Sequence, residues 1–429
     1  MKSFIPLIRS EWRLLLFGFA MTFASSLGQT YFIALFGGEI RADLGLSHGE
    51  FGTVYSAATL LSAVILLWSG TLIDRMDLRH FSYLLVAGLG GACLLLAAST
   101  NIWMLLVSIL LLRHLGQGLM SMTSTTAMVR YLDHQKGKAN ALSGIGYSVS
   151  EAVLPGLVVA LLYWLSWRQS WIFWAAVMAV IMPLLIYRLL RNHEQRHQAY
   201  LQAFEDEHKA EDTGTTAVTA AANPQGGLAP LKKRRQWTRA EVIRDPQFYL
   251  FLPALMTLPM LFTGFMFHQV HLVDEKGWSL AIWSSLYILY AITTTVMKLI
   301  AGLLVDRFGA IVLVSLMVLP LALGLLILSV SDHLMAAVLF MFFLGIAAGL
   351  YTTLTAPFFS EKYGNKHLGS IKSLSTSVMV FASAVSPVIM GWLIDRGVSM
   401  DAMALGSVGY ISVASGMAAY AYRLYRAGG

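Results

Sequence analysis

Three formally charged residues, Arg113, Glu151 and Lys298, lie well inside long apolar stretches of the chain. A charge at the centre of a bilayer costs roughly 2.5–3.5 kcal/mol even on lenient scales, so each needs a partner or a wet cavity. Arg113 is suited to hold an anion, Glu151 to take up and release a proton, and Lys298 to be a second cation. The alternatives are a permanent Arg113–Glu151 ion pair, or a Lys298 side chain that reaches the membrane interface.

Polar side chains recur at helical spacing around these charges, which predicts faces that line a cavity rather than face lipid. The residues involved are Arg113, Gln117, Ser121 and Ser124 in one stretch, and Trp283, Tyr287, Tyr290, Thr294 and Lys298 in another. Single serines and threonines are also common helix–helix contacts in membranes. We expect Arg113, Lys298, Gln29, Gln117 and Tyr290 to bind substrate and Glu151 to couple transport to protons.

Composition identifies the elements that must position these groups. Of the 429 residues, 57% are hydrophobic and only 12% are charged, which excludes an ordinary soluble protein. Apolar stretches long enough to cross a bilayer recur twelve times, which predicts an all-α integral membrane protein. The predicted spans are 14–36, 49–70, 82–99, 102–127, 139–163, 170–190, 247–270, 280–303, 311–330, 334–358, 370–392 and 402–422.

The basic residues are distributed as a topology signal. The net charge is +7, but 24 of the 30 Lys and Arg residues lie on one set of loops and only four on the opposite set. This asymmetry predicts that both termini and the central segment are cytoplasmic, and it argues against a nucleic-acid partner. The basic cluster at 232–235 is interpreted as a topology anchor, the alternative being a site for a partner or an anionic lipid.

The chain repeats at an offset of 232 residues. Gly137, Ser143 and Pro155 fall on Gly369, Ser375 and Pro387 at this offset. The repeat predicts two pseudo-symmetric six-helix bundles, residues 1–190 and 246–429, joined by a polar cytoplasmic linker, residues 191–245. Glu151 falls on Ser383, so the charged residues are not part of the repeat.

A short motif is also duplicated. Gly70, Leu72, Asp74 and Arg75 follow the second span, and Gly302, Leu304, Asp306 and Arg307 follow the eighth. The pattern G-x-L-x-D-R in these two places resembles the major facilitator superfamily over essentially the whole chain. The resemblance implies twelve helices in two bundles and transport by alternating access. The glycine allows close helix approach, and the carboxylate faces a helix N-terminus of the other half, so we expect Gly70, Asp74, Arg75, Gly302, Asp306 and Arg307 to act in conformational gating.

Within that superfamily, the chain is most similar to bacterial relatives of the monocarboxylate and oxalate–formate porters. The residues that carry this resemblance are Arg113, Gly116, Gln117, Gly118, Gly146, Glu151, Pro155, Trp167, Arg168, Trp237, Arg244, Asp245, Pro246 and Phe248. It implies a secondary transporter of a small organic anion, coupled to protons or working by exchange. The acidic–aromatic signature of those porters is absent around Gln29, and Thr294 stands where they carry an acid. The alternatives are a transporter of a neutral or cationic solute, and a membrane sensor that does not transport.

The sequence contains no nucleotide-binding loop, metal-ligand cluster or nucleophile–base motif, which predicts no enzyme activity and no cofactor. The single cysteine, Cys93, lies in an apolar run and is expected to pack in the interior. The expected partners are a small-molecule substrate and membrane lipid. We expect a monomer in the plasma membrane, that is, the inner membrane of a bacterium.

Overall fold

The computed structural model describes residues 5–132, 135–191, 193–194, 197–198, 236–364 and 367–427, without the side chains of Asp74, Arg75, Lys136 and Ser370. Eleven of its helices are long and apolar enough to cross a membrane. One further pair, Ile5–Gly28 with Thr30–Leu44, is bent by 51° and makes a twelfth span when counted as one. The predicted basic cluster at 232–235 lies outside the described residues.

The first six spans form one bundle. Its elements are α1 (Ile5–Ala24), a 3-10 turn (Ser25–Gly28), α2 (Thr30–Ile33), α3 (Gly37–Leu44), α4 (His48–Ser69), α5 (Leu72–Arg75), α6 (Leu78–Ala97), α7 (Ile102–Leu111), a π-helical stretch (Leu112–Met120), α8 (Ser121–Tyr131), α9 (Lys136–Leu162), α10 (Trp167–Ala176), a second π-helical stretch (Val177–Ile181) and α11 (Met182–Leu189).

The second bundle repeats this arrangement with longer helices. Its elements are α13 (Arg239–Arg244), α14 (Pro246–Phe267), α15 (Gln269–Glu275), α16 (Leu280–Phe308), α17 (Ala310–Val314), α18 (Leu319–Val330), α19 (Leu334–Tyr363), α20 (Leu368–Asp395) and α21 (Met400–Ala427). The predicted single helix 311–330 is divided into α17 and α18. Pro320 stands in the first turn of α18, where its missing N–H costs nothing.

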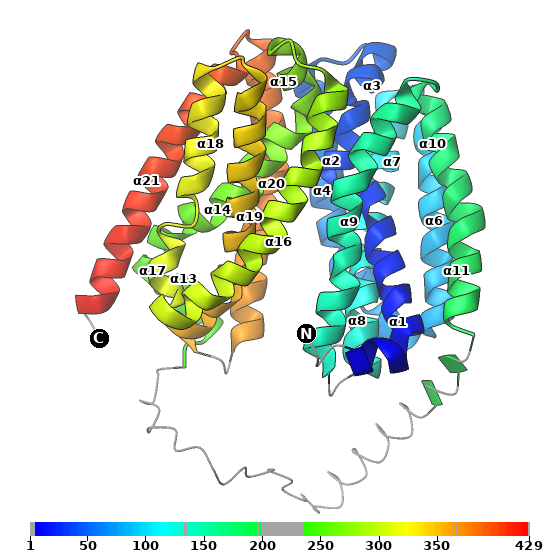
Figure 1. Ribbon diagram of the computed structural model, residues 1–429, viewed down its shortest axis with the longest axis horizontal. Helices are drawn as coiled ribbons and strands as arrows, with labels where there is room; N and C mark the ends of the chain where they lie inside the picture. The colour runs from blue at the N-terminus through cyan, green and yellow to red at the C-terminus, as the bar shows by residue number, and fades with distance from the viewer. Residues whose placement is uncertain are drawn as a thin grey trace, which may run out of the picture.

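The two bundles stand side by side, with both chain termini at one end of the molecule (Figure 1). We call this the terminal end, and the opposite end, where α3 and α15 lie, the distal end. The bundles meet through two antiparallel helix pairs, α4 with α20 and α9 with α16. Toward the terminal end the helices of the two bundles diverge (Figure 1).

The first span is longer and less regular than the predicted helix 14–36. Its helix is interrupted at Gln29, whose backbone is extended (φ −85°, ψ 151°), and it continues to Leu44. Ser25, Ser26 and Gly28 disfavour a continuous helix because serine hydroxyls compete for backbone groups and glycine adds chain entropy. The break leaves backbone carbonyls without helical partners deep in the bundle, which is tolerated only where protein groups satisfy them.

Candidate functional site

Arg113 is buried at the break of the first span. Its Nη1 donates to the carbonyl oxygen of Gly28 at 3.2 Å and to Thr30 Oγ1 at 3.4 Å. Its guanidinium lies 5.1 Å from the ring centroid of Tyr55, and Thr30 and Tyr55 are hydrogen-bonded to each other at 2.6 Å. Arg113 Nε is buried without a hydrogen-bond partner. Arg113 therefore satisfies a freed carbonyl, but every contact it makes within the described residues is with a neutral group.

The approach of Arg113 to this break depends on two glycines. A Cβ on Gly28 would lie 2.2 Å from the carbonyl oxygen of Leu112, and a Cβ on Gly116 would lie 2.9 Å from the nitrogen of Gly28. The backbones thus touch where the first and fourth spans cross. Arg113 stands in the π-helical stretch Leu112–Met120, a geometry that recurs at functional sites because it re-aims side chains.

The alternative of a permanent Arg113–Glu151 ion pair is not found in this conformation. The two residues lie at similar depth, 11 residues from the distal ends of their helices or about 17 Å, yet no ion pair joins them. Equal depth on neighbouring helices does not produce an ion pair here, because the Arg113 side chain points toward the first span instead of toward Glu151. Glu151 is buried beside tyrosines from both halves, with Tyr31, Tyr147, Tyr287 and Tyr290 within electrostatic reach of its carboxylate.

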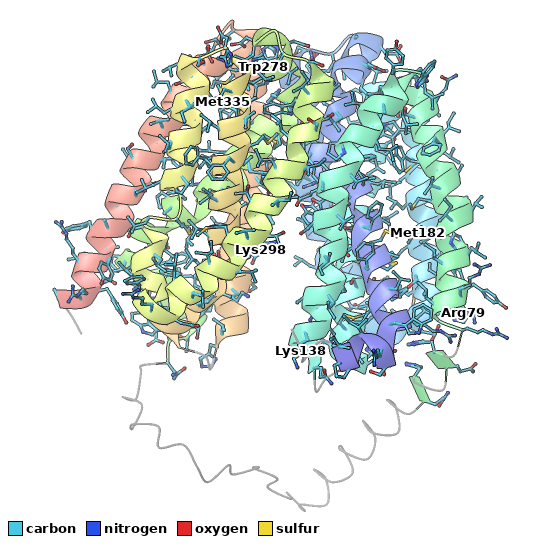
Figure 2. The ribbon with its side chains drawn as sticks, viewed as in Figure 1. Arg79, Lys138, Met182, Trp278, Lys298 and Met335 are labelled. Carbon is cyan, nitrogen blue, oxygen red and sulfur yellow. The ribbon has the colours of Figure 1, made fainter. Side chains whose placement is uncertain are left out.

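Lys298 is the charged partner that the structure places near Glu151. It lies on α16 in the part of the helix nearer the terminal end (Figure 2) and acts electrostatically on Glu151 across the α9–α16 interface. Lys298 is half-buried and makes no hydrogen bond or close ion pair with any residue that the structure describes. The described interior therefore brings together one carboxylate and one cation from opposite halves, with Arg113 separate.

The remaining predicted binding residues lie around this centre. Tyr290 is buried, and its ring lies 5.9 Å from that of Phe262. Gln29 occupies the break of the first span and is partly exposed, as is Gln117. Ser124, which was predicted to line the cavity, instead joins two helices, because its hydroxyl donates to the carbonyl oxygen of Gly18 at 2.9 Å. Thr22 makes a similar contact with the carbonyl oxygen of Ser143 at 2.7 Å. These two are helix–helix contacts, the alternative expected of single hydroxyls.

A buried glutamine missed by the sequence analysis closes the distal side of this centre. Gln269 Nε2 donates to the carbonyl oxygen of Tyr31 in the other half at 2.9 Å. Its Oε1 accepts hydrogen bonds from Trp283 Nε1 at 3.0 Å and Tyr287 Oη at 2.8 Å. The rings of Tyr31 and Tyr287 pack across the halves with centroids 5.7 Å apart and planes tilted by 42°. The aromatic residues of α16 were predicted to line a cavity. Trp283 and Tyr287 instead hydrogen-bond to Gln269 and help close the distal side of the centre.

The gating motifs differ between their two copies. A Cβ on Gly70 would meet Met122 at 3.2 Å, in agreement with a close helix approach, whereas one on Gly302 would meet nothing within 4 Å. Asp306 and Arg307 are exposed, and neither contacts the other half within the described residues. The expected contact of the second carboxylate with a helix N-terminus is therefore not made in this conformation, because the halves diverge at this end. The side chains of Asp74 and Arg75 lie outside the described part of the chain.

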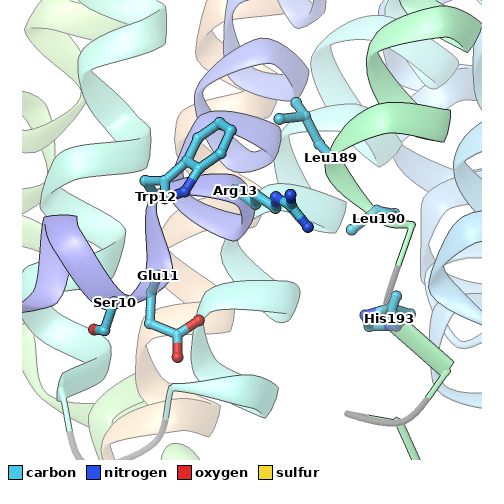
Figure 3. A pocket seen from close by; sticks show the side chains of 7 residues that line it. All are labelled: Ser10, Glu11, Trp12, Arg13, Leu189, Leu190 and His193. Atoms are coloured by element: carbon cyan, nitrogen blue, oxygen red, sulfur yellow. The ribbon is translucent and has the colours of Figure 1, made fainter.

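A separate pocket opens at the terminal end, where α1 kinks at Glu11 (φ −119°, ψ 20°). It has a volume of about 270 Å³ and is lined by Ser10, Glu11, Trp12, Arg13, Leu189, Leu190 and His193 (Figure 3). It shares no residue with the charged centre and lies at the outer edge of one bundle. The charged centre, in contrast, has Glu151 and Lys298 on the two helices that meet across the halves, α9 and α16.

Comparisons with known proteins agree with this architecture. The family model described as the Major Facilitator Superfamily matches residues 18–387. No curated protein matches the chain in sequence. A bacterial homologue of the human lysosomal transporter Spinster, solved in an inward-facing and unoccupied conformation, superposes with a TM-score of 0.64 at 13% identity over 96% of both chains. The nucleoside transporter NupG superposes with a TM-score of 0.68 at 13% identity over 96% of this chain and 98% of its own. The chain belongs to the major facilitator superfamily, and it is a membrane transporter whose described residues form eleven membrane-spanning helices, or twelve with the bent first span.

Proposed function

We propose that this transporter moves a small organic anion of the monocarboxylate type by alternating access, driven by protons or by exchange. Arg113 and Lys298 hold the anion, Gln29, Gln117 and Tyr290 contribute polar contacts, and Glu151 carries the coupling proton. The distribution of basic residues supports a bacterial inner membrane with both termini in the cytoplasm, so that this conformation opens inward.

The observation that carries the proposal is the missing counter-ion of Arg113. Its described partners are a carbonyl, a hydroxyl and an aromatic ring, and its Nε has none. A buried cation without a carboxylate is costly, and a protein retains one where function supplies the counter-charge. Arg113 and Lys298 together with Glu151 leave one positive charge uncompensated. A solute with a single negative charge balances it.

The arrangement also suggests how the solute could be coupled to a proton. Lys298 and Glu151 come from opposite halves and lie within electrostatic reach of each other. An anion bound to Lys298 competes with Glu151 for that cation and favours the protonated carboxyl, because the local negative charge increases. Anion and proton would then enter together, which is the linkage that proton-coupled uptake of an anion requires.

The test is a thermal-shift screen of the purified protein, followed by uptake into liposomes. Small carboxylates should stabilise the wild type in proportion to their saturation, whereas sugars, amino acids and nucleosides should not. Arg113→Gln should weaken carboxylate binding about tenfold or more, since a charge-assisted hydrogen bond is lost. Arg168→Gln is the matched control, because Arg168 pairs with Asp43 at 2.7 Å on the distal surface. Unchanged carboxylate transport in both Arg113→Gln and Lys298→Gln would contradict the anion site.

A neutral or cationic solute is the second candidate, and the tyrosines around Glu151 favour it. Four tyrosines and one carboxylate form an environment that also suits an amine or a stacked ring. In that case the role of Arg113 is limited to its hydrogen bond with the carbonyl oxygen of Gly28 at the break of the first span. Stabilisation by amines or nucleosides that survives in Arg113→Gln and is lost in Glu151→Gln would favour this candidate.

A further inference from the structure

The sequence contains a third G-x-L-x-D-R segment, at the distal end. Gly391, Leu393, Asp395 and Arg396 end α20, in the same pattern that follows the second and eighth spans. Unlike those two copies, this one lies at the end where the two halves are in contact. Its carboxylate has a partner that the sequence alone did not indicate.

Asp395 receives two backbone hydrogen bonds from the other half. Its Oδ1 accepts from the N–H of His48 at 3.0 Å and its Oδ2 from the N–H of Gly49 at 2.8 Å. These are the first two residues of α4. A carboxylate at a helix N-terminus is favoured both by the unpaired N–H groups and by the helix dipole.

The N-terminus of α4 needs this partner from outside. Its own capping box, made by Ser47 and Glu50, satisfies the N–H groups of these two residues only. The N–H groups of His48 and Gly49 remain, and both point to Asp395. When the halves separate at this end, these two groups lose their protein partner and must bind water.

The glycine of the third segment permits the approach. A Cβ on Gly391 would lie 2.5 Å from the carbonyl oxygen of His48 and 2.9 Å from the nitrogen of Gly49. On the facing helix, a Cβ on Gly52 would lie 2.5 Å from the carbonyl oxygen of Pro387. The Cβ of any other residue at position 391 would therefore collide with the backbone of α4 and separate the ends of α4 and α20.

The second copy of the motif shows the same parts disengaged. Asp306 is exposed without a partner among the described residues, and Gly302 faces open space at the end where the halves diverge. One copy is thus engaged where the bundles are closed, and another is released where they are apart. This is the arrangement required of two latches that alternate.

We propose that Asp395 and the N-terminus of α4 form a latch that holds the distal end closed, opposed by the Asp306 copy at the terminal end. The latch rests on alternating access as proposed above, but not on the identity of the solute. Asp395 is a positioning residue that acts on the balance between the two conformations. Its carboxylate is exposed to solvent, so its effect is that of an ordinary helix cap.

The experiment measures how often the distal end opens, with one cysteine as reporter. Cys93 is the only cysteine and is fully buried, so it is replaced by alanine and a cysteine is placed at Ser56. Ser56 is buried between the halves, where its hydroxyl donates to the carbonyl of Ala384. Its modification by a maleimide in detergent requires separation of the halves. No substrate is needed, so the result is independent of the anion proposal.

Asp395→Asn should raise the rate of modification about two- to fivefold, because the amide loses the negative charge at the N-terminus of α4 and keeps one acceptor oxygen for two N–H groups. Gly391→Ala should raise it in the same direction through steric separation. Asp306→Asn and Gly302→Ala, at the matching positions of the released copy, should lower the rate or leave it unchanged. The double variant Asp395→Asn with Asp306→Asn should return toward the wild-type rate.

Asp401→Asn is the control for general loosening at the distal end, because Asp401 pairs with Lys276 at 2.6 Å inside one half. An unchanged rate in Asp395→Asn, or an equal rise in Asp401→Asn, would overturn the latch. Variants are compared only as monodisperse protein after size-exclusion chromatography. If Asp395→Asn does not fold, Gly391→Ala with Gly302→Ala as its control decides the question in the same assay.

Discussion

Glu151 is a buried acidic side chain on α9, which packs against α16 of the other half, and its neighbours are tyrosines rather than Arg113. Tyr147 is hydrogen-bonded to the Glu151 carboxyl, and a tyrosine can orient a carboxyl group but cannot neutralise a carboxylate. Lys298 is the cation within reach. For these single residues, occupation of Lys298 by an anionic solute and protonation of Glu151 therefore favour each other.

We predict that Glu151→Gln abolishes uptake driven by a pH gradient while solute exchange across the membrane is retained. The amide resembles the protonated carboxyl, so the halves can still move with solute bound, but no proton is carried. The measurement is uptake into liposomes with and without a pH gradient, beside counterflow of labelled solute. Glu39→Gln is the matched control, because Glu39 accepts the N–H of Trp167 near the distal surface. Gradient-driven uptake that persists in Glu151→Gln would exclude this role.

At the scale of elements, the broken first span and the π-helical stretch of the fourth span form one unit. The break frees the carbonyl of Gly28, the π-helical stretch directs Arg113 to it, and the two glycines allow the backbones to meet. Each irregularity would be unfavourable alone in a membrane, where unpaired backbone groups are costly. Together they give a rigid crossing that positions the cation.

Gly28→Ala should therefore destabilise the protein by about 1–3 kcal/mol, since its methyl group would collide with the backbone of Leu112. Gly91→Ala is the control, because a Cβ there meets nothing within 4 Å and a helical glycine gains roughly 0.4–1 kcal/mol on replacement by alanine. The two variants should shift the thermal unfolding midpoint in opposite directions. Equal midpoints would show that the crossing is not tightly packed.

At the scale of the whole molecule, three histidines are gathered where the halves close at the distal end. The His48 ring lies 4.5 Å from that of His271 and 5.8 Å from that of His268. Burial lowers the pKa of His268 to about 3 and also lowers that of His271. The charged groups that face this cluster are Arg41, Asp274, Glu275 and Asp395.

These histidines make closure at the distal end pH-dependent. With lowered pKa values they are neutral in the closed state, and they return to an ordinary pKa of about 6.5 when opening exposes them to water. The stabilisation of the closed state is thus present above pH 6.5 and is lost as the pH falls. Modification of the cysteine at position 56 should rise roughly tenfold between pH 8 and pH 5, after correction for the reagent's own pH dependence.

His268→Gln should flatten this pH dependence, whereas His80→Gln should not, because His80 is exposed at the terminal end. A pH profile that is identical in wild type and His268→Gln would contradict the role of the histidines. Since the measurement follows the opening of the distal end directly, it separates this effect from any titration of Glu151 during transport.

The class of the molecule follows from its amino-acid sequence alone. Long apolar stretches, the asymmetry of basic residues and the repeat at 232 residues predicted a membrane protein of two six-helix bundles, because the bilayer leaves few other solutions for such a pattern. It also singled out Arg113, Glu151 and Lys298, since charges inside apolar helices are rare. Helix ends and the break at Gln29 were less predictable, because they depend on packing partners.

Which of these residues contact one another depends on tertiary packing. The sequence places Arg113 and Glu151 on adjacent helices, where they could form an ion pair. In the structure, Arg113 instead contacts Gly28, and Lys298 of the other half lies near Glu151. Gln269 and Asp395 gain their partners from segments more than 200 residues away. No local sequence pattern encodes such contacts, because they depend on how the two bundles pack against each other. In alternating access, the relative orientation of the bundles changes during transport.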